Sequence, residues 1–380
     1  MNWVAWQMLT GDRAKYWGTI FGIAFGTLLI SQQTALFIGL MRRTANQIDD
    51  VREATIWVMD TEVQNTDEVR PLSETDVFRV RGVPGVSWAV RYYKGLARAK
   101  VSDGRFRQVM MMGLDETTLV GAPVDMLLGS LADLSRPDGI IVDRSGFEYL
   151  WPGVEPCLGQ TIEMNDRRAV VVGICSAGAP FQTFPLVFTR YTRALEFAPP
   201  ERSRLSFVLA QPEPGRSRDD VCRAITAQTG LLALSRDQFF WRTIGYYMRS
   251  TGIPVNFGIT IVLGFIVGTA IAGQTFYLFT LENLRQFGAL KAMGLSNGRL
   301  VRMILLQATV VGSVGFGLGV GMTAMFFEAT KNVTHLSGFY LPWQVVIGTA
   351  VAVTLIVILA SLVSVRRVLV LETAIVFRGA

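Results

Sequence analysis

The chain has 380 residues, of which 50% are hydrophobic and 17% are charged. Soluble domains usually carry about 25% charged residues, so this composition argues against an ordinary soluble protein and indicates contact with lipid. A formal net charge of +6 suits a nucleic-acid-binding protein only where basic residues cluster on a folded surface. Here many of them flank apolar runs, as basic residues beside membrane spans do, so no nucleic acid is expected as a partner.

The N-terminus predicts a cytoplasmic segment over 1–16 and a first transmembrane helix over 17–41. This apolar run exceeds the roughly 20 residues that a helix needs to cross about 30 Å of hydrocarbon. A cleaved signal peptide is the alternative, because Arg13 and Lys15 precede the run. The run is longer than the apolar part of a signal peptide and lacks a small-residue cleavage site before Arg42, so we expect a retained helix.

Residues 42–252 predict a mixed α/β domain that is large enough for its own core. Short β-rich runs separated by Gly, Pro and Asp turns predict strands at Val86–Tyr93, Phe106–Leu114, Gly139–Asp143, Ala169–Ile174, Pro185–Thr189 and Leu205–Ala210. Helices are expected at Ser73–Val80 and Arg218–Thr229. The domain also holds all three cysteines, whose odd count and irregular spacing favour free thiols over a disulfide: Cys157, Cys175 and Cys222.

Three further apolar runs predict transmembrane helices over 253–281, 303–327 and 344–365. The loops between them are 282–302 and 328–343, and a tail covers 366–380. Lys and Arg collect in the first loop and in the tail, which places both on the cytoplasmic side. The sequence therefore predicts an α-helical membrane protein with four transmembrane helices, cytoplasmic termini, and the large α/β domain outside the cytoplasm between the first and second helices.

Glycines recur every four residues in the first two spans, at Gly18, Gly22 and Gly26 and at Gly264 and Gly268. Small residues at this spacing line one face of a helix and let another helix approach closely. The neighbouring helix can belong to the same chain or to a second copy, and the spacing does not separate these two alternatives. We expect the first or second span to contribute to a dimer contact.

No motif of a self-sufficient enzyme or pump stands out in the chain. No Gly-Lys dipeptide occurs, which excludes a Walker A loop, and neither HExxH nor GxGxxG is present. The sole histidine, His335, has no neighbouring ligands that would suit a metal site. The spans hold no charged residue, which argues against an ion-coupled carrier. We expect a non-catalytic subunit with no catalytic, cofactor-binding or metal-binding residues, driven by energy from another chain.

The segment Leu281–Leu295 is a charged helical connection between the second and third spans. Its apolar residues follow a three-residue spacing, at Leu281, Leu284, Phe287 and Leu290. The other faces carry Glu282, Arg285, Gln286 and Lys291. Gly294 is placed to end this helix and Ser296 to cap the next one. The segment is either a solvated connector or a docking surface for a cytoplasmic motor.

The same segment resembles the FtsX-like permease superfamily, which includes MacB and DevC-type proteins. The family pattern is matched by Glu282, Gln286, Phe287, Gly288, Leu290, Lys291, Ala292, Met293 and Gly294. The C-terminal sequence LVLETAIVFRG is similar to the ending of the family, except that Thr373 stands where proline is usual. The overall sequence pattern is most similar to that of DevC-type permeases.

The resemblance implies the permease subunit of an ABC exporter in the bacterial inner membrane. It implies a homodimer, a separate ATPase that binds ATP and Mg, a periplasmic adaptor (membrane fusion protein), an outer-membrane duct, and a hydrophobic or amphiphilic substrate. The alternative is a non-transporting FtsX-like signal transmitter that activates an extracytoplasmic hydrolase; the size of the outer domain favours export. Together with the position of the segment, the resemblance predicts ATPase coupling at Glu282, Leu284, Arg285, Phe287, Gly288, Leu290, Lys291 and Gly294.

Overall fold

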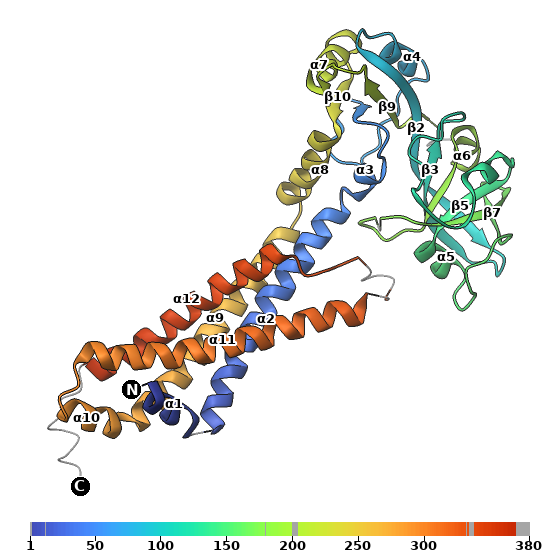
Figure 1. The fold of residues 1–380 in the computed structure, drawn as a ribbon. Helices are drawn as coiled ribbons and strands as arrows, with labels where there is room; N and C mark the ends of the chain where they lie inside the picture. The colour runs from blue at the N-terminus through green and yellow to red at the C-terminus, as the bar shows by residue number, and fades with distance from the viewer. Residues whose placement is uncertain are drawn as a thin grey trace. The chain divides into compact units, whose positions relative to one another are not determined.

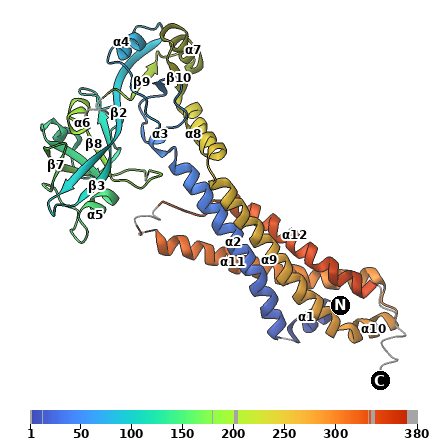
Figure 2. The ribbon, with the colours of Figure 1, turned by 180° about the vertical axis from the view of Figure 1, so that it is seen from behind.

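The computed structural model describes residues 2–11, 13–178, 180–199, 204–331, 333 and 338–369. The chain divides into two compact units (Figures 1 and 2). A helical unit joins Met1–Gly39 to Gly252–Ala380, and a second unit, the ectodomain, is Leu40–Thr251. His335 and the C-terminal motif from Leu371 onward lie outside the described residues.

The helical unit contains, among the described residues, four helices that are long and apolar enough to cross a membrane. The predicted four-span organisation, with a mixed α/β domain between the first and second spans, is confirmed. The helices of this unit are α1 (Asn2–Gly11), α2 (Arg13–Arg43), α9 (Ile253–Glu282), α10 (Leu284–Ala292), α11 (Asn297–Thr330) and α12 (Trp343–Leu369).

The bundle core combines β-branched and small side chains from all four long helices. Ile20 and Ile23 of α2 are fully buried, as are Ala272 of α9 and Ile356 of α12. Large apolar side chains on the outer faces stay exposed, as Val255 of α9 does at 64%. An isolated helix face of this kind is stable only in an apolar solvent, so the outer faces fit lipid.

The ectodomain begins with an antiparallel sheet in the order β10, β1, β9 and the first half of β2. Residue Ile56 of β1 lies opposite Ser235 of β10, and the Arg236 N–H donates to the Thr55 oxygen at 2.9 Å. The bounds of these strands are β1 (Ile56–Met59), β2 (Val86–Val101), β9 (Phe207–Pro212) and β10 (Leu232–Ser235).

Both faces of this sheet are buried, because successive side chains of a strand point to opposite sides. Ile56 and Val58 belong to one buried cluster, which also contains side chains of α4 (Asp76–Arg81) and α7 (Arg218–Thr229). Trp57 and Met59 belong to another, which contains Phe239 of α8. The helices on this second side are α3 (Asn46–Asp50) and α8 (Arg236–Ser250).

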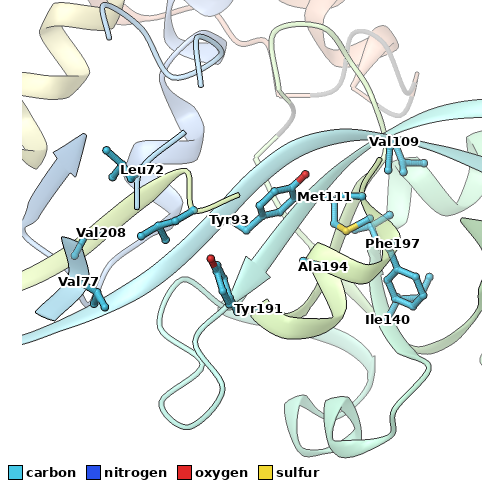
Figure 3. Packing of buried hydrophobic residues seen from close by; sticks show 14 of the residues in the cluster. Leu72, Val77, Tyr93, Val109, Met111, Ile140, Tyr191, Ala194, Phe197 and Val208 are labelled. Atoms are coloured by element: carbon cyan, nitrogen blue, oxygen red, sulfur yellow. The ribbon is translucent and has the colours of Figure 1, made fainter. Parts of the chain in front are cut away.

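The second half of β2 enters a closed ring of strands. Its order is β2, β3, β8, β5, β7 and β6, and β6 pairs back onto β2 at Ala99–Val101. One cluster of buried residues runs from the sheet into the ring, as Figure 3 shows for Val208, Tyr93 and Val109. The ring strands are β3 (Phe106–Leu114), β5 (Gly139–Asp143), β6 (Thr161–Met164), β7 (Arg167–Ser176) and β8 (Leu186–Arg190).

The remaining elements cover or extend this ring. They are β4 (Asp125–Gly129), which pairs with β7, a 3-10 turn at Leu131–Ser135, α5 (Arg144–Leu150) and α6 (Tyr191–Phe197). The three cysteines are free, and Cys175 and Cys222 are buried.

Most of the predicted strands and helices are confirmed. The bounds of β3, β5 and α7 agree with the prediction, whereas β2 continues past Tyr93 to Val101. The continuation was not expected because its alternating pattern is interrupted at Gly95, and pairing with β3 and β6 keeps the strand extended there.

We predict that residues 40–251 unfold cooperatively as a separate chain and that Trp57 is central to their stability. Trp57 is 2% exposed and its ring lies 5.7 Å from Tyr92, 5.4 Å from Phe207 and 5.6 Å from Phe239. Trp57→Ala should lower the free energy of unfolding by about 3 to 5 kcal/mol. Circular dichroism during urea titration measures this change.

Trp57→Phe and Phe78→Ala are the controls for this prediction. The first keeps most of the ring volume, and the second truncates a side chain that is 57% exposed. Aggregation of the wild-type fragment under all conditions, or equal stability of Trp57→Ala and wild type, would contradict the prediction.

Candidate functional site

Glycines allow α2 and α9 to touch through their backbones. A Cβ added at Gly22 would lie 2.3 Å from Ile271 Cγ2, and one added at Gly26 would lie 3.1 Å from the Gly268 Cα. Gly264 likewise faces α2. The four-residue spacing left open whether the neighbouring helix belongs to the same chain or to a second copy. At these four glycines the structure shows a helix of the same chain.

In this structure Gly22, Gly26, Gly264 and Gly268 pack within the chain, so the dimer contact that we expect from the first or second span would use other faces of α2 and α9. The space beside them is already filled by a helix of the same chain, so a second copy has no access to it. Gly18 differs, because nothing lies within 4 Å of a Cβ added there. Spacing alone could not reveal this difference between Gly18 and Gly22.

A second face of α2 packs against α11. A Cβ added at Gly319 would lie 2.5 Å from Thr27 Cβ, and one at Gly315 would lie 2.8 Å from Ile23 Cγ2. The hydroxyls of Ser31 and Thr323 form a buried hydrogen bond of 2.7 Å between the two helices. Hydroxyl pairs of this kind stabilise helix contacts in membranes by about 1 kcal/mol. Sequence reasoning did not identify this pair, because single hydroxyl residues in a span carry no positional signal.

Gly294 ends α10 in the left-handed region, with φ +91°. The Leu295 N–H donates to the Leu290 oxygen and the Gly294 N–H donates to the Lys291 oxygen, both at 3.1 Å. These two bonds are the Schellman arrangement, which fits glycine because a Cβ is disfavoured at positive φ. The expected helix end is therefore confirmed. Ser296 precedes α11 without a capping bond from its side chain.

The apolar side of α10 is covered by the chain itself. Phe287 is 0% exposed and packs with Leu300, Ile304 and Val368, and Leu290 lies half-buried beside them. Gly288 is also buried. The Phe287 ring therefore offers no exposed surface to a partner protein in this structure, and it holds α10 against α11 and α12.

The outward side of α10 and its ends remains exposed. Glu282, Arg285 and Gln286 are exposed, and Met293 is 73% exposed. Leu284 is half-buried. This surface combines charges of both signs with one long apolar side chain, a composition that suits recognition by another protein.

Polar contacts lie near both ends of α10. The Lys15 ammonium of α2 pairs with the Glu282 carboxylate, where α9 ends. The Lys291 ammonium lies 3.4 Å from the Leu369 oxygen at the end of α12. With the Phe287 cluster, these contacts connect the short helix to its neighbours in the bundle. Within the described part of the chain, no group of three or more His, Cys, Asp or Glu residues could hold a metal ion.

Two protein families match the chain. The family described as MacB-like periplasmic core domain matches residues 17–228, and the family described as FtsX-like permease C-terminal matches residues 258–372.

Relatives with similar sequences include proteins named uncharacterised ABC transporter permeases. One from Mycobacterium tuberculosis is 25% identical over 318 residues, which is 81% of this chain and 80% of the relative. One from Mycobacterium bovis is 30% identical over 224 residues, which is 58% of each chain.

Two solved structures similar to the chain are parts of transporters that lie outside the membrane. The periplasmic region of MacB from Actinobacillus actinomycetemcomitans is 14% identical and has a TM-score of 0.38, covering 54% of this chain and 96% of that one. The extracellular domain of the ABC-type transporter YknZ from Gram-positive bacteria is 16% identical and has a TM-score of 0.35, covering 48% and 98%.

We predict that Gly22→Leu destabilises the bundle and that Gly18→Leu does not. The leucine at position 22 would overlap Ile271, whereas position 18 has open space. Overpacking of this kind costs about 1 to 3 kcal/mol. Thermal unfolding of the purified protein in detergent should show a lower midpoint for Gly22→Leu alone. Equal midpoints for the two variants would mean that α2 does not pack on α9 as described.

We also predict that Gly294→Val destabilises the end of α10, whereas Gly294→Asn is tolerated. A β-branched residue at φ +91° is strained by about 1 to 2 kcal/mol, and asparagine visits the left-handed region more readily. Hydrogen exchange of the peptide that spans Leu284–Leu300 should be faster in Gly294→Val only. Matching exchange in both variants and wild type would contradict the assignment.

Proposed function

Because this chain belongs to the FtsX-like permeases with a MacB-like periplasmic core domain, and is thus an ABC transporter permease, we propose that it drives export by transmitting motion to its ectodomain. The energy comes from ATP hydrolysis in a separate ATPase subunit, which holds the ATP and Mg. The substrate is a hydrophobic or amphiphilic molecule that is moved on the outer side of the membrane.

The observation that carries this proposal is that α10 is packed against the bundle on one side and exposed on the other. Its exposed side offers Arg285 and Met293 to a partner, while its buried side is locked to α11 and α12 through Phe287. A helix held on one side transmits a displacement instead of absorbing it, since packed interfaces deform little. We assign the ATPase-coupling role to the exposed residues and a supporting role to Phe287, Gly288 and Gly294.

Motion received at α10 can reach the ectodomain along the two helices that are joined to it in sequence. The Lys15–Glu282 pair joins α2 and α9 close to α10. Helix α2 continues into the ectodomain past Leu40, and α9 follows it after Thr251. Both helices that bound the ectodomain in sequence are therefore linked to the proposed docking segment.

The basic loop and tail support an orientation with both termini in the cytoplasm and the ectodomain in the periplasm. We further propose that the chain acts in the bacterial inner membrane as a homodimer with an ATPase, a periplasmic adaptor and an outer-membrane duct, as a DevC-type permease would. The size of the ectodomain, Leu40–Thr251, supports export over the FtsX-like role of activating an extracytoplasmic hydrolase. Copurification with proteins encoded by neighbouring genes separates the two: an adaptor supports export and a peptidoglycan hydrolase supports signalling.

We predict that Arg285→Glu and Met293→Asp reduce ATPase retention, while Phe287→Leu does not. Removing a residue at the centre of an interface typically weakens binding by about tenfold or more. Phe287→Leu keeps an apolar side chain in a buried place, so the exposed surface is unchanged. Copurification of the ATPase and its ATP turnover are the measurements.

Protease protection of the ectodomain serves as the insertion control for all three variants. The coupling assignment fails if the two exposed variants retain the ATPase and normal export, because the segment is then only a connector. It also fails if Phe287→Leu alone loses the ATPase.

A further inference from the structure

The ectodomain has a pocket of about 330 Å³ beside the point where β2 passes from the sheet into the ring. Its apolar lining includes Val69, Leu96 and Met110. Its polar lining includes Asp67, Lys94 and Arg204. Leu96 of β2 lies opposite Met110 of β3 in the strand ladder, so a regular part of the ring forms the floor.

Lys94 of β2 connects the floor of this pocket to the wall that contains Thr66 and Asp67 through hydrogen bonds. Its ammonium donates to the Thr66 carbonyl oxygen at 2.7 Å, to Thr66 Oγ1 at 3.0 Å and to Asp67 Oδ1 at 2.7 Å. All three ammonium protons are therefore used, and the positive charge is balanced by Asp67. Burial lowers the pKa of Lys94, and the Asp67 carboxylate opposes this lowering. The wall next to Val69 is thus a fixed and electrically neutral surface.

The unbalanced charge of the pocket lies at its mouth. Arg204 is exposed and has no ion-pair partner within the described ranges of the chain, in contrast to Lys94. Gln182, also exposed, adds an amide that can donate hydrogen bonds. A guanidinium and an amide at the mouth, above an apolar floor, suit a ligand with an anionic head and an apolar chain.

We propose that this pocket binds a single alkyl chain that carries an anionic headgroup. The chain would lie on Val69, Leu96 and Met110, and the headgroup would meet Arg204 and Gln182. The volume is at the lower end of the range of about 300 to 1,000 Å³ that ligand pockets occupy, which favours one chain over a two-chain lipid. The proposal deepens the proposed export function, on which it rests only for the step from binding to transport.

The fixed wall also connects the pocket to α8. The Tyr247 hydroxyl donates to Asp67 Oδ2 at 2.9 Å, and the Arg242 Nε donates to the Val63 oxygen at 3.2 Å. Both donors belong to α8, which ends at Ser250 and is followed by α9 from Ile253. A ligand that presses on this wall therefore acts on the helix that precedes a membrane span.

The test uses the full chain in phosphatidylcholine nanodiscs, without ATPase or nucleotide. The probe is dodecanoate with a photoreactive diazirine at its methyl end, and labelled peptides are identified by mass spectrometry. Label should concentrate on the peptides that contain Val69, Leu96 or Met110. Unlabelled dodecanoate should compete roughly tenfold better than dodecanol, which lacks the charge, and than butyrate, which lacks the chain.

Matched variants separate the pocket from the rest of the ectodomain. Arg204→Glu and Val69→Glu should weaken labelling by about tenfold, while Arg204→Lys, which keeps the positive charge, should retain most of it. Arg223→Glu and Val154→Glu place the same changes at exposed ectodomain positions and should leave labelling as in wild type. Thermal unfolding checks that each variant is folded; the exposed position of Arg204 keeps the test valid if Val69→Glu unfolds.

Label spread evenly over the ectodomain, or wild-type labelling of Arg204→Glu, overturns the proposal. Equal competition by dodecanol removes the headgroup assignment, and equal competition by butyrate removes the apolar floor. Because the assay contains no ATPase, a failure of the coupling segment leaves this result unchanged. Conversely, if the pocket takes no label while the wild-type chain retains the ATPase, only the proposed binding site fails and the proposed export function stands.

Discussion

Close packing of helix backbones is the constraint on which the helical unit depends. Lipid gives apolar helices little reason to associate, so packing between backbones and buried hydrogen bonds must hold them together. Gly22 and Gly26 give α2 one such face toward α9. Toward α11 the glycine lies on the other helix, because Gly319 of α11 faces Thr27 of α2. The Ser31–Thr323 hydrogen bond fixes the register of these two helices. With α2 placed in this way, the outward side chains of α9 and α12, such as Val255 and Leu362, are left to face lipid.

The same arrangement explains why α10 can be both short and rigid. A helix of its length, Leu284–Ala292, is marginal on its own in water, because nucleation is costly and few hydrogen bonds follow it. Burial of Phe287, the Schellman bonds at Gly294 and the ion pair of Glu282 with Lys15 supply the missing stabilisation. Apart from Glu282, which is exposed and also pairs with Lys15, the residues that stabilise the segment are distinct from the exposed residues that we propose as its contact surface.

Sequence patterns predicted what depends on neighbouring residues and missed what depends on distant ones. The spans, β3 and the positive φ of Gly294 follow from local hydrophobicity, alternation and helix ends. The glycine rows and the apolar row of α10 predicted that these faces are covered, but not by which chain, because periodicity carries no information about the partner. Closure of the ring by β6 and the pairing of Leu96 with Met110 in the pocket floor depend on non-local contacts. Helix α8 is a different kind of omission, since its capping box of Ser235 and Gln238 is visible in the sequence.

Under the proposed transmission of motion, the pairing of β1 with β10 determines how load enters the ectodomain. Ile56 faces Ser235, and a hydrogen bond from the Arg236 N–H to the Thr55 oxygen closes the ladder just beyond them. The two tethers of the domain, which are the chain segments that lead to α2 and to α9, therefore leave from one point of the sheet. When the two tethers move together, the ladder carries no relative force and the sheet travels as a whole. When one tether slides past the other, the hydrogen bonds of this short ladder are loaded in shear. The ectodomain therefore responds differently to joint and to opposed movement of α2 and α9, and β1–β10 is the pair of strands that distinguishes the two.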